Sequence, residues 1–480
     1  MENNRKGYLL YLRKEKIIEI VVGIILFFAL FVWGMVQPIG NQPDEHCRYL
    51  LPCYIMTEGK LPNGYDLKLL IGTYGISYGF FPGLPYIFMA LFMRITCFFT
   101  VSPYALLMSA RVVNMLAAVV TYVYVRKTSK RLFEHPLTAW FFTLVICFWP
   151  QVMFIFTYVN CDGFAFMSVA IMSYALIRGL KDGWSPASYI QLAVGMAVCL
   201  LSYYNAYGVI VGAAVVFAFS FFTREKEYNF KDTTVKEGPK VRKKLSFDWK
   251  NFLKYGFIIL GITFLLAGWW FIRNYILYDG DLFGLSSNAK LAEQYASDIY
   301  KPSLKVTLQN SGNPIYCLAL NQDFRFLLKQ SFFARFGNMD ILAPNYIIRG
   351  FKIIMLVCIL GLFIPNRHHV LSGPKRFGFN LGMLIGALIT FILTYWYSYA
   401  NDYQPQGRYL LPGLIPLMCV IFMGIQNITY LVEKYKYGKI IMNIVYIVSY
   451  IYIALVTVGC ILLIWSQYGS AFSDTLAMVF

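Results

Sequence analysis

The chain has 480 residues, of which 58% are hydrophobic and only 14% are charged. Soluble domains carry about 25% charged residues, so this composition excludes an ordinary water-soluble protein and indicates an all-α polytopic membrane protein. The net charge of +18 is compatible with nucleic-acid binding. Most of the excess positive charge lies in segments between apolar runs on one side of the predicted membrane, which is typical of cytoplasmic loops. We therefore expect no nucleic-acid partner.

The first half of the chain predicts a basic cytoplasmic N-terminus, residues 1–16, followed by an N-terminal transmembrane module, residues 17–272. Its first outer loop, residues 37–103, is expected to contain two interfacial helices, because a span at 80–100 would place the basic run 126–131 outside. Spans are predicted at residues 17–36, 105–125, 137–157, 164–177, 189–202, 209–222 and 252–272. Residues 223–250 are predicted to form a flexible cytoplasmic loop.

The second half predicts a long outer segment and further spans. Residues 273–345 are expected to form an extracytoplasmic cap, and residues 346–480 to form the C-terminal transmembrane helices. Spans are predicted at residues 348–364, 379–397, 409–425 and 440–465. The chain then crosses the bilayer of the cell (inner or plasma) membrane about eleven times, with its N-terminus inside and its C-terminus outside.

Polar residues of mixed type gather in the predicted outer segments, whereas the inner loops carry no comparable mixture of acid, amide and arginine. Such one-sidedness is what an extracytoplasmic active site needs. The candidate residues are Asp44, Glu45, His46, Arg48, Asn160, Asp162, Arg273, Asn274, Arg335, Gln406, Arg408 and Tyr409.

Each candidate also has a structural explanation. Asp44 can act as a catalytic base or can cap the following helix, and Asn160 and Asp162 can bind substrate or cap the helix that starts near Gly163. Arg273 and Arg408 can anchor helix ends among interfacial aromatics, or can bind a phosphate in a bidentate fork. The carboxylates and the scattered cysteines form no clear ligand set, so no metal site is assigned, although a divalent cation remains compatible with the sequence.

Five short motifs, in this order along the chain, resemble those of the GT-C glycosyltransferases. They occupy residues 43–46, 158–162, 270–274, 331–337 and 406–409. With an acidic pair in the first outer loop, two interfacial helices and about eleven spans, the layout is similar to the branch of protein O-mannosyltransferases and the lipid A aminoarabinose transferase. The motifs also look similar to an uncharacterised family of bacterial polytopic proteins that is distantly related to these enzymes.

The resemblance implies transfer of a sugar from a polyprenyl-phosphate-linked donor to an extracytoplasmic acceptor, which is a cell-envelope glycan, a lipid or a protein. It assigns the base to Asp44 or Glu45, with Asp44 favoured. In the aminoarabinose branch a Lys-Pro-Pro-type segment helps to bind the donor phosphate, whereas residues 80–85 here keep the prolines without a basic residue. Phosphate binding is therefore expected from Arg273 and Arg408.

Two alternatives stay open. A transporter or flippase of a lipid-linked glycan predicts polar residues inside the spans, and the sequence has few, such as Arg111 and Asn114. A non-catalytic partner in cell-envelope assembly predicts that Asp44 and Arg408 can be replaced without loss of function.

Overall fold

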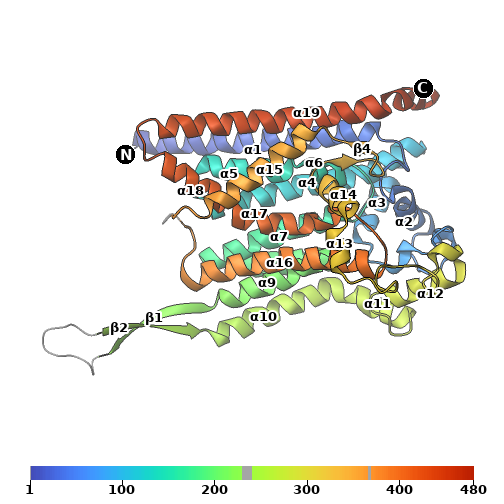
Figure 1. The fold of residues 1–480 in the computed structure, drawn as a ribbon, viewed down its shortest axis with the longest axis horizontal. Helices are drawn as coiled ribbons and strands as arrows, with labels where there is room; N and C mark the ends of the chain where they lie inside the picture. Colours follow the sequence, from blue (N-terminus) through green and yellow to red (C-terminus); the bar gives the residue numbers. More distant parts are fainter. Residues whose placement is uncertain (1, 230–239, 366–368, 480) are drawn as a thin grey trace.

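Apolar segments in a bilayer form helices because each backbone N–H and C=O group must find its partner within the segment. In the computed structural model, which describes residues 2–229, 240–365 and 369–479, these segments build one elongated helical bundle (Figure 1). Seven helical segments of the described chain are long and apolar enough to cross a membrane. They are Lys14–Val36, Pro103–Leu132, Asp162–Asp182, Trp249–Leu277, Gly373–Ala400, Gly407–Val432 and Gly438–Ser470.

Seven of the eleven predicted spans correspond to these segments, and the other four lie on shorter helices, so the count of about eleven spans stays a prediction. The N-terminal part contains α1 (Glu2–Val36), α4 (Pro103–Leu132), α5 (Pro136–Cys147), α6 (Pro150–Ile155), α7 (Asp162–Asp182), α8 (Pro186–Leu200), η3 (Tyr204–Ala206), α9 (Tyr207–Phe219), α10 (Trp249–Thr263), the π-helical turn η5 (Phe264–Gly268) and α11 (Trp269–Leu277). The C-terminal part contains α15 (Asn345–Gly361), α16 (Gly373–Ala400), η7 (Gly407–Gly413), α17 (Leu414–Ile421), α18 (Met423–Val432) and α19 (Gly438–Val479).

The structure corrects two predicted segments. The span expected at 137–157 is broken between α5 and α6, where Pro150 lacks the N–H that a continuous helix needs. The loop expected to be flexible at 223–250 instead contains two antiparallel strands, β1 (Phe222–Asn229) and β2 (Lys240–Phe247), with Phe222 opposite Phe247. Residues 230–239 of that prediction lie outside the described part of the chain.

The bundle has two different ends (Figure 1). One end carries β1–β2, and the other carries the short helices of the predicted outer segments: α2 (Glu45–Glu58), η1 (Leu67–Leu69), η2 (Tyr78–Phe80), α3 (Leu84–Thr96), α12 (Leu285–Tyr295), η6 (Asp298–Tyr300), α13 (Tyr316–Leu320), α14 (Gln322–Phe333), and the paired strands β3 (Arg335–Phe336) and β4 (Ile341–Leu342). The expectation of two short helices in the first loop is confirmed, since α2 has 14 residues and α3 has 13.

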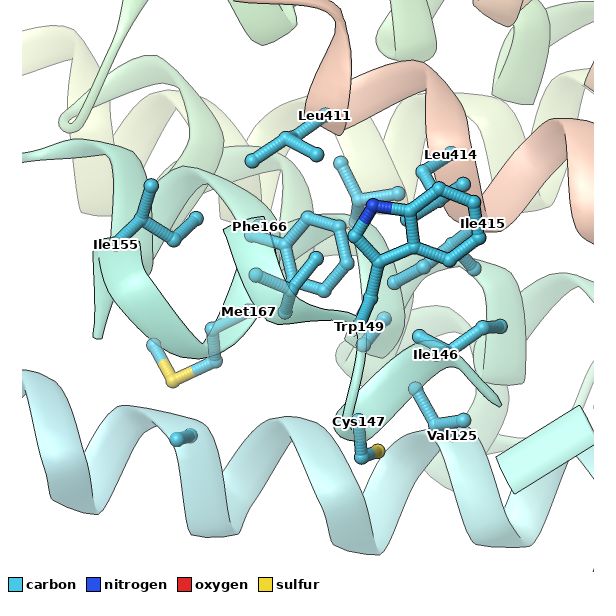
Figure 2. Close-up of a cluster of buried hydrophobic side chains, with 14 of the residues drawn as sticks. Val125, Ile146, Cys147, Trp149, Ile155, Phe166, Met167, Leu411, Leu414 and Ile415 are labelled. Carbon is cyan, nitrogen blue, oxygen red and sulfur yellow. The ribbon is translucent and has the colours of Figure 1, made fainter. Parts of the chain in front are cut away.

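A close-packed apolar core lies where α4 to α7 meet η7 and α17. Figure 2 shows the indole of Trp149 lying among Leu411, Leu414 and Ile415. The indole is fully buried, and its Nε1 donates to the backbone oxygen of Phe332 at 2.8 Å. Trp149 lies between α5 and α6, and its hydrogen bond to Phe332 links the core to the long outer segment.

Candidate active site

Asp44 occupies an unusual backbone position just before α2. Its φ of 60° lies in the left-handed region, which few residues other than glycine adopt and which aspartate tolerates better than most. Its carboxylate makes no capping hydrogen bond to α2, so the helix-cap explanation is wrong. Instead, Oδ2 accepts a hydrogen bond from Arg408 NH2 at 3.1 Å, and 40% of the side chain stays exposed.

Arg408 joins three of the sequence motifs. It is the second residue of η7, and its side chain is only 2% exposed. One guanidinium nitrogen donates to the hydroxyl of Tyr158 at 3.0 Å, and the nitrogen that binds Asp44 also donates to the hydroxyl of Tyr409 at 3.3 Å. Its Nε has no partner in the described structure, so one donor remains available to a ligand.

The two arginines nearest to Asp44 determine its protonation. Burial raises the pKa of the Asp44 carboxyl, but the charges of Arg408 and Arg48 and hydrogen bonds from Arg408 and Tyr78 outweigh burial and lower it below 3.8. The carboxylate is therefore ionised at neutral pH and able to accept a proton. Any anion that competes for Arg408 weakens this stabilisation and makes Asp44 more basic.

Arg48 lies on the first turn of α2 and is also buried. One of its nitrogens donates to the Tyr86 hydroxyl and to Cys161 Sγ, each at 3.0 Å, and its guanidinium lies 4.3 Å from the centre of the Tyr78 ring. Its Nε, like that of Arg408, has no partner within the described residues. Two buried arginines with free N–H groups can together bind a phosphate.

Asp162 and Asn160, two residues apart, play different parts. Asp162 is the first residue of α7, where an acid is favoured by the helix dipole; its side chain is buried, and Oδ2 has no partner among the described residues. Its charge acts on Arg408. The Asn160 amide instead accepts from the Gly163 backbone N–H at 3.1 Å and donates to two backbone oxygens, so its capping explanation is favoured.

Glu45 cannot reach a substrate, although it is adjacent to Asp44. Its side chain has no exposed surface and binds Arg111 in a bidentate fork, at 2.8 and 2.6 Å. It also accepts from the backbone N–H of Val159 at 2.9 Å. The buried position argues against the role of base that the sequence left open for Glu45, and makes it a link between α2, α4 and the turn before α7.

The other predicted residues bind elsewhere. Arg273 donates to the Pro62 backbone oxygen at 2.7 Å, and Asn274 donates to those of Phe80 and Leu282, so both hold outer loops together. This placement contradicts the expectation that Arg273 joins Arg408.

Arg335 holds the β3–β4 turn through the Met339 backbone oxygen. Gln406 donates to Gln404 at 2.7 Å, and the ring of exposed His46 lies 3.0 Å from Cys47 Sγ. Within the described residues, no group of three or more histidine, cysteine or acidic side chains could hold a metal ion.

The sequence identified Tyr409 but not the other tyrosines near Arg48 and Arg408. Tyr158, together with Cys161, lies inside one of the five motifs, so its position was available as a signal. Tyr78 and Tyr86 lie in the aromatic-rich segment before and within α3, and nothing in the sequence separates them from lipid-facing aromatics.

The bundle is similar to solved membrane enzymes. ArnT from Cupriavidus metallidurans, solved bound to undecaprenyl phosphate, matches with a TM-score of 0.50 at 11% identity, over 95% of this chain and 75% of ArnT. The oligosaccharyltransferase of Archaeoglobus fulgidus, solved with zinc and sulfate, matches with a TM-score of 0.45 at 13% identity, over 92% of this chain and 53% of the enzyme.

The prediction of a polytopic α-helical protein with a GT-C-like fold is thus confirmed. No curated protein matches the chain. A family model described as "Predicted membrane protein (DUF2142)" matches residues 51–418. The chain therefore belongs to this family of membrane proteins.

Proposed function

We propose that the protein is a GT-C-type glycosyltransferase that moves a sugar from a polyprenyl-phosphate donor to an extracytoplasmic acceptor, with Asp44 as the general base. The fold shared with ArnT, which was solved with undecaprenyl phosphate bound, supports a lipid-linked donor. The observation that carries the proposal is the partly exposed carboxylate of Asp44 beside buried Arg408.

The chemistry needs few groups. The acceptor hydroxyl or amine gives its proton to Asp44 as its oxygen or nitrogen forms the new bond to the anomeric carbon. The bond from that carbon to the phosphate oxygen breaks, and the released polyprenyl phosphate carries the negative charge. Arg48 and Arg408, whose charges both act on Asp44, stabilise the charge of the released phosphate. One carboxylate suffices for this inverting displacement, since the phosphate leaves without protonation.

The ion pair between Asp44 and Arg408 gives donor binding a second effect. When the phosphate binds Arg408, it competes with Asp44 for the same guanidinium. Loss of that contact raises the pKa of the Asp44 carboxyl toward the range where it removes a proton effectively. Donor binding therefore prepares the base, and the acceptor is deprotonated only when the donor is present.

Asp162 supplies a second acceptor of hydrogen bonds. Its Oδ2 is buried without a partner among the described residues, and the charge of Asp162 acts on Arg408. A hydroxyl of the sugar or of the acceptor can donate a hydrogen bond to this oxygen. A hydroxyl group donates to this oxygen without adding charge to the site. We assign Asp162 to positioning and Asp44 to proton transfer.

The test is sugar transfer in proteoliposomes supplied with a panel of radiolabelled polyprenyl-phosphate sugars and a bacterial envelope extract as acceptor. Wild type should transfer label, and Asp44→Asn should not. Glu58→Gln is the matched control, because Glu58 is an acid at the other end of α2 that pairs with Lys68 at 2.6 Å. Movement of labelled lipid between leaflets without transfer, unaffected by Asp44→Asn, would replace this proposal with a flippase.

A further inference from the structure

Two tyrosine rings lie together at the outer end of the bundle. Tyr74 belongs to the loop between η1 and η2, and Tyr300 is the last residue of η6, which follows α12 at the end opposite to β1–β2 (Figure 1). The ring centres are 4.6 Å apart and the ring planes are inclined at 64°. Tyr74 is 45% exposed and Tyr300 is half-buried. We call this pair the aromatic platform; the proposed chemistry uses neither ring.

The turn that carries Tyr74 is held against the segment before η6. Gly75 has a φ of 61°, and a Cβ atom on it would lie 2.3 Å from the backbone nitrogen of Ala296, so the close approach requires glycine. The backbone N–H and the hydroxyl of Ser297 both donate to the Thr73 backbone oxygen, at 3.3 and 3.0 Å. These contacts fix the two rings of the platform relative to each other.

The aromatic platform continues into the candidate active site. Tyr78 follows Tyr74 by four residues; its ring lies 4.3 Å from the guanidinium of Arg48, and its hydroxyl bonds to the Asp44 carboxylate. Partial burial, contact with Tyr300 and the charge of Asp44 raise the pKa of the Tyr74 hydroxyl, so Tyr74 lies within electrostatic range of the candidate base. A ligand that rests on the platform can therefore extend to Asp44.

The surroundings of the platform indicate what rests on it. Exposed tyrosines can anchor a protein in the membrane interface, but Asp298, two residues before Tyr300, is 80% exposed and pairs with Lys301 at 2.8 Å, as expected in water. An acceptor peptide is commonly held by pairing with a strand edge. Among the described residues of this end, the strands are two residues long (β3 and β4) or a single bridge between Ile71 and Ile76, which offers no such edge.

A sugar ring suits the platform better than a lipid chain or a peptide. One face of a sugar ring presents C–H groups, which pack against an aromatic ring, whereas its hydroxyl groups lie around the edge and stay in water. A tyrosine offers the same combination of an apolar ring and a polar hydroxyl.

We propose that the aromatic platform of Tyr74 and Tyr300 binds a sugar ring of the acceptor, so that the acceptor is a glycan. This inference rests on the proposed transferase function and names its acceptor class. The bound sugar packs against the rings, and a hydroxyl of that sugar or of its neighbour in the glycan reaches Asp44. Because packing and not the phenol hydroxyl supplies the affinity, phenylalanine can replace Tyr74.

The test is equilibrium dialysis of the full-length protein in lipid nanodiscs, free of sugar-based detergent. The probes are short oligosaccharides, released from a bacterial envelope extract by mild acid and labelled with a fluorophore at the reducing end. Wild type should bind them saturably, and Tyr74→Ala/Tyr300→Ala should bind about 10- to 30-fold more weakly. Tyr74→Phe should stay within about threefold of wild type. The matched control is Tyr316→Ala, which removes an exposed tyrosine from α13 in the same outer segment.

A kinetic measurement separates binding from a general structural effect. In the transfer assay, Tyr74→Ala should raise the KM for the acceptor about tenfold, with the KM for the donor and kcat within about twofold of wild type. A uniform loss of kcat without a change in the acceptor KM would overturn the platform.

The remaining outcomes distinguish this inference from the proposed function. Equal oligosaccharide binding by wild type and Tyr74→Ala/Tyr300→Ala would overturn the platform and leave the transferase intact. Absence of saturable binding by wild type, or binding of tryptic peptides from the same extract through the same two rings, would also overturn it. Binding that depends on both rings, in a protein that transfers no sugar, would support the platform as a glycan site and contradict the transferase.

Discussion

Asp44 and Glu45 are adjacent in the chain, but each forms an ion pair with a different arginine in different surroundings. Asp44 pairs with Arg408 through one contact at 3.1 Å and keeps 40% of its side chain exposed, whereas Glu45 and Arg111 have no exposed side-chain surface. The first pair can exchange partners with a ligand. The second is enclosed, and the cost of separating its charges makes it permanent. Exposure, and not residue type, therefore separates the candidate base from the structural acid.

The contacts of the buried Glu45–Arg111 pair explain how it supports the neighbouring Asp44. Glu45 fixes the start of α2 to α4 through Arg111, and to the turn before α7 through the Val159 N–H. Arg111 also donates to the backbone oxygens of Gly34 and Gln37, both at 2.7 Å, at the end of α1. The buried pair thus holds the loop on which Asp44 is placed.

Loss of the exposed acid should have the largest effect on transfer. Asp44→Asn keeps the size of the side chain and removes the base, so we expect transfer to fall about 10²- to 10⁴-fold. Stability should change by less than about 1 kcal/mol, since the ion pair is partly exposed. Transfer in proteoliposomes and unfolding in mixed micelles measure the two effects. Full transfer activity in the Asp44→Asn protein would show that Asp44 is not the general base.

Breaking the buried pair should give the opposite result. Arg111→Met leaves the Glu45 carboxylate buried without a partner, so we expect a loss of about 3–5 kcal/mol in the free energy of unfolding. The double variant Glu45→Leu/Arg111→Met should lose less than Arg111→Met alone, because no unpaired charge remains. Equilibrium unfolding in mixed micelles decides this. A double variant that loses as much as Arg111→Met alone would show that the loss does not come from an unpaired Glu45 carboxylate.

Asp162→Asn should have an intermediate effect on transfer. It removes a charged acceptor near Arg408 while it preserves the shape of the α7 start, so we expect transfer to fall about 10- to 150-fold. Asn160→Asp is the nearby comparison, since the Asn160 amide is already used by backbone groups. Steady-state transfer at varied donor and acceptor concentrations measures the effect. An unchanged rate would remove Asp162 from the site.

The smallest expected change is a shift in the pKa of Asp44. Arg408 holds this pKa below 3.8, so Arg408→Gln should raise it and extend the protonated form to higher pH. Carbodiimides react with protonated carboxyl groups, so labelling of Asp44 followed by mass spectrometry should continue to higher pH in the variant. Labelling profiles that coincide would show that Arg408 does not control the base. This labelling measurement does not depend on transfer activity.

The sequence predicted the helical membrane architecture well, because long apolar runs leave few other choices in a bilayer. It also placed Asp44, Arg48, Asp162 and Arg408 among the candidates, because acids and arginines at the ends of apolar runs are costly to place there without a partner. It failed where local composition is ambiguous. The strands β1 and β2 depend on pairing between residues 11 to 25 apart in the sequence, which periodicity within either segment cannot indicate.

The amino-acid sequence specifies the set of candidate residues and the side of the membrane on which they are expected. Which of these residues come into contact depends on how the helices pack. Asp44 and Arg408 are far apart in the chain and become neighbours through the contact between the residue before α2 and the η7 turn, while Arg273 is turned toward Pro62. The structure also separates Asp44 from Glu45, because it buries Glu45 and leaves Asp44 partly exposed. Burial depends on the residues packed around a side chain, so it cannot be inferred from two adjacent acids in a sequence.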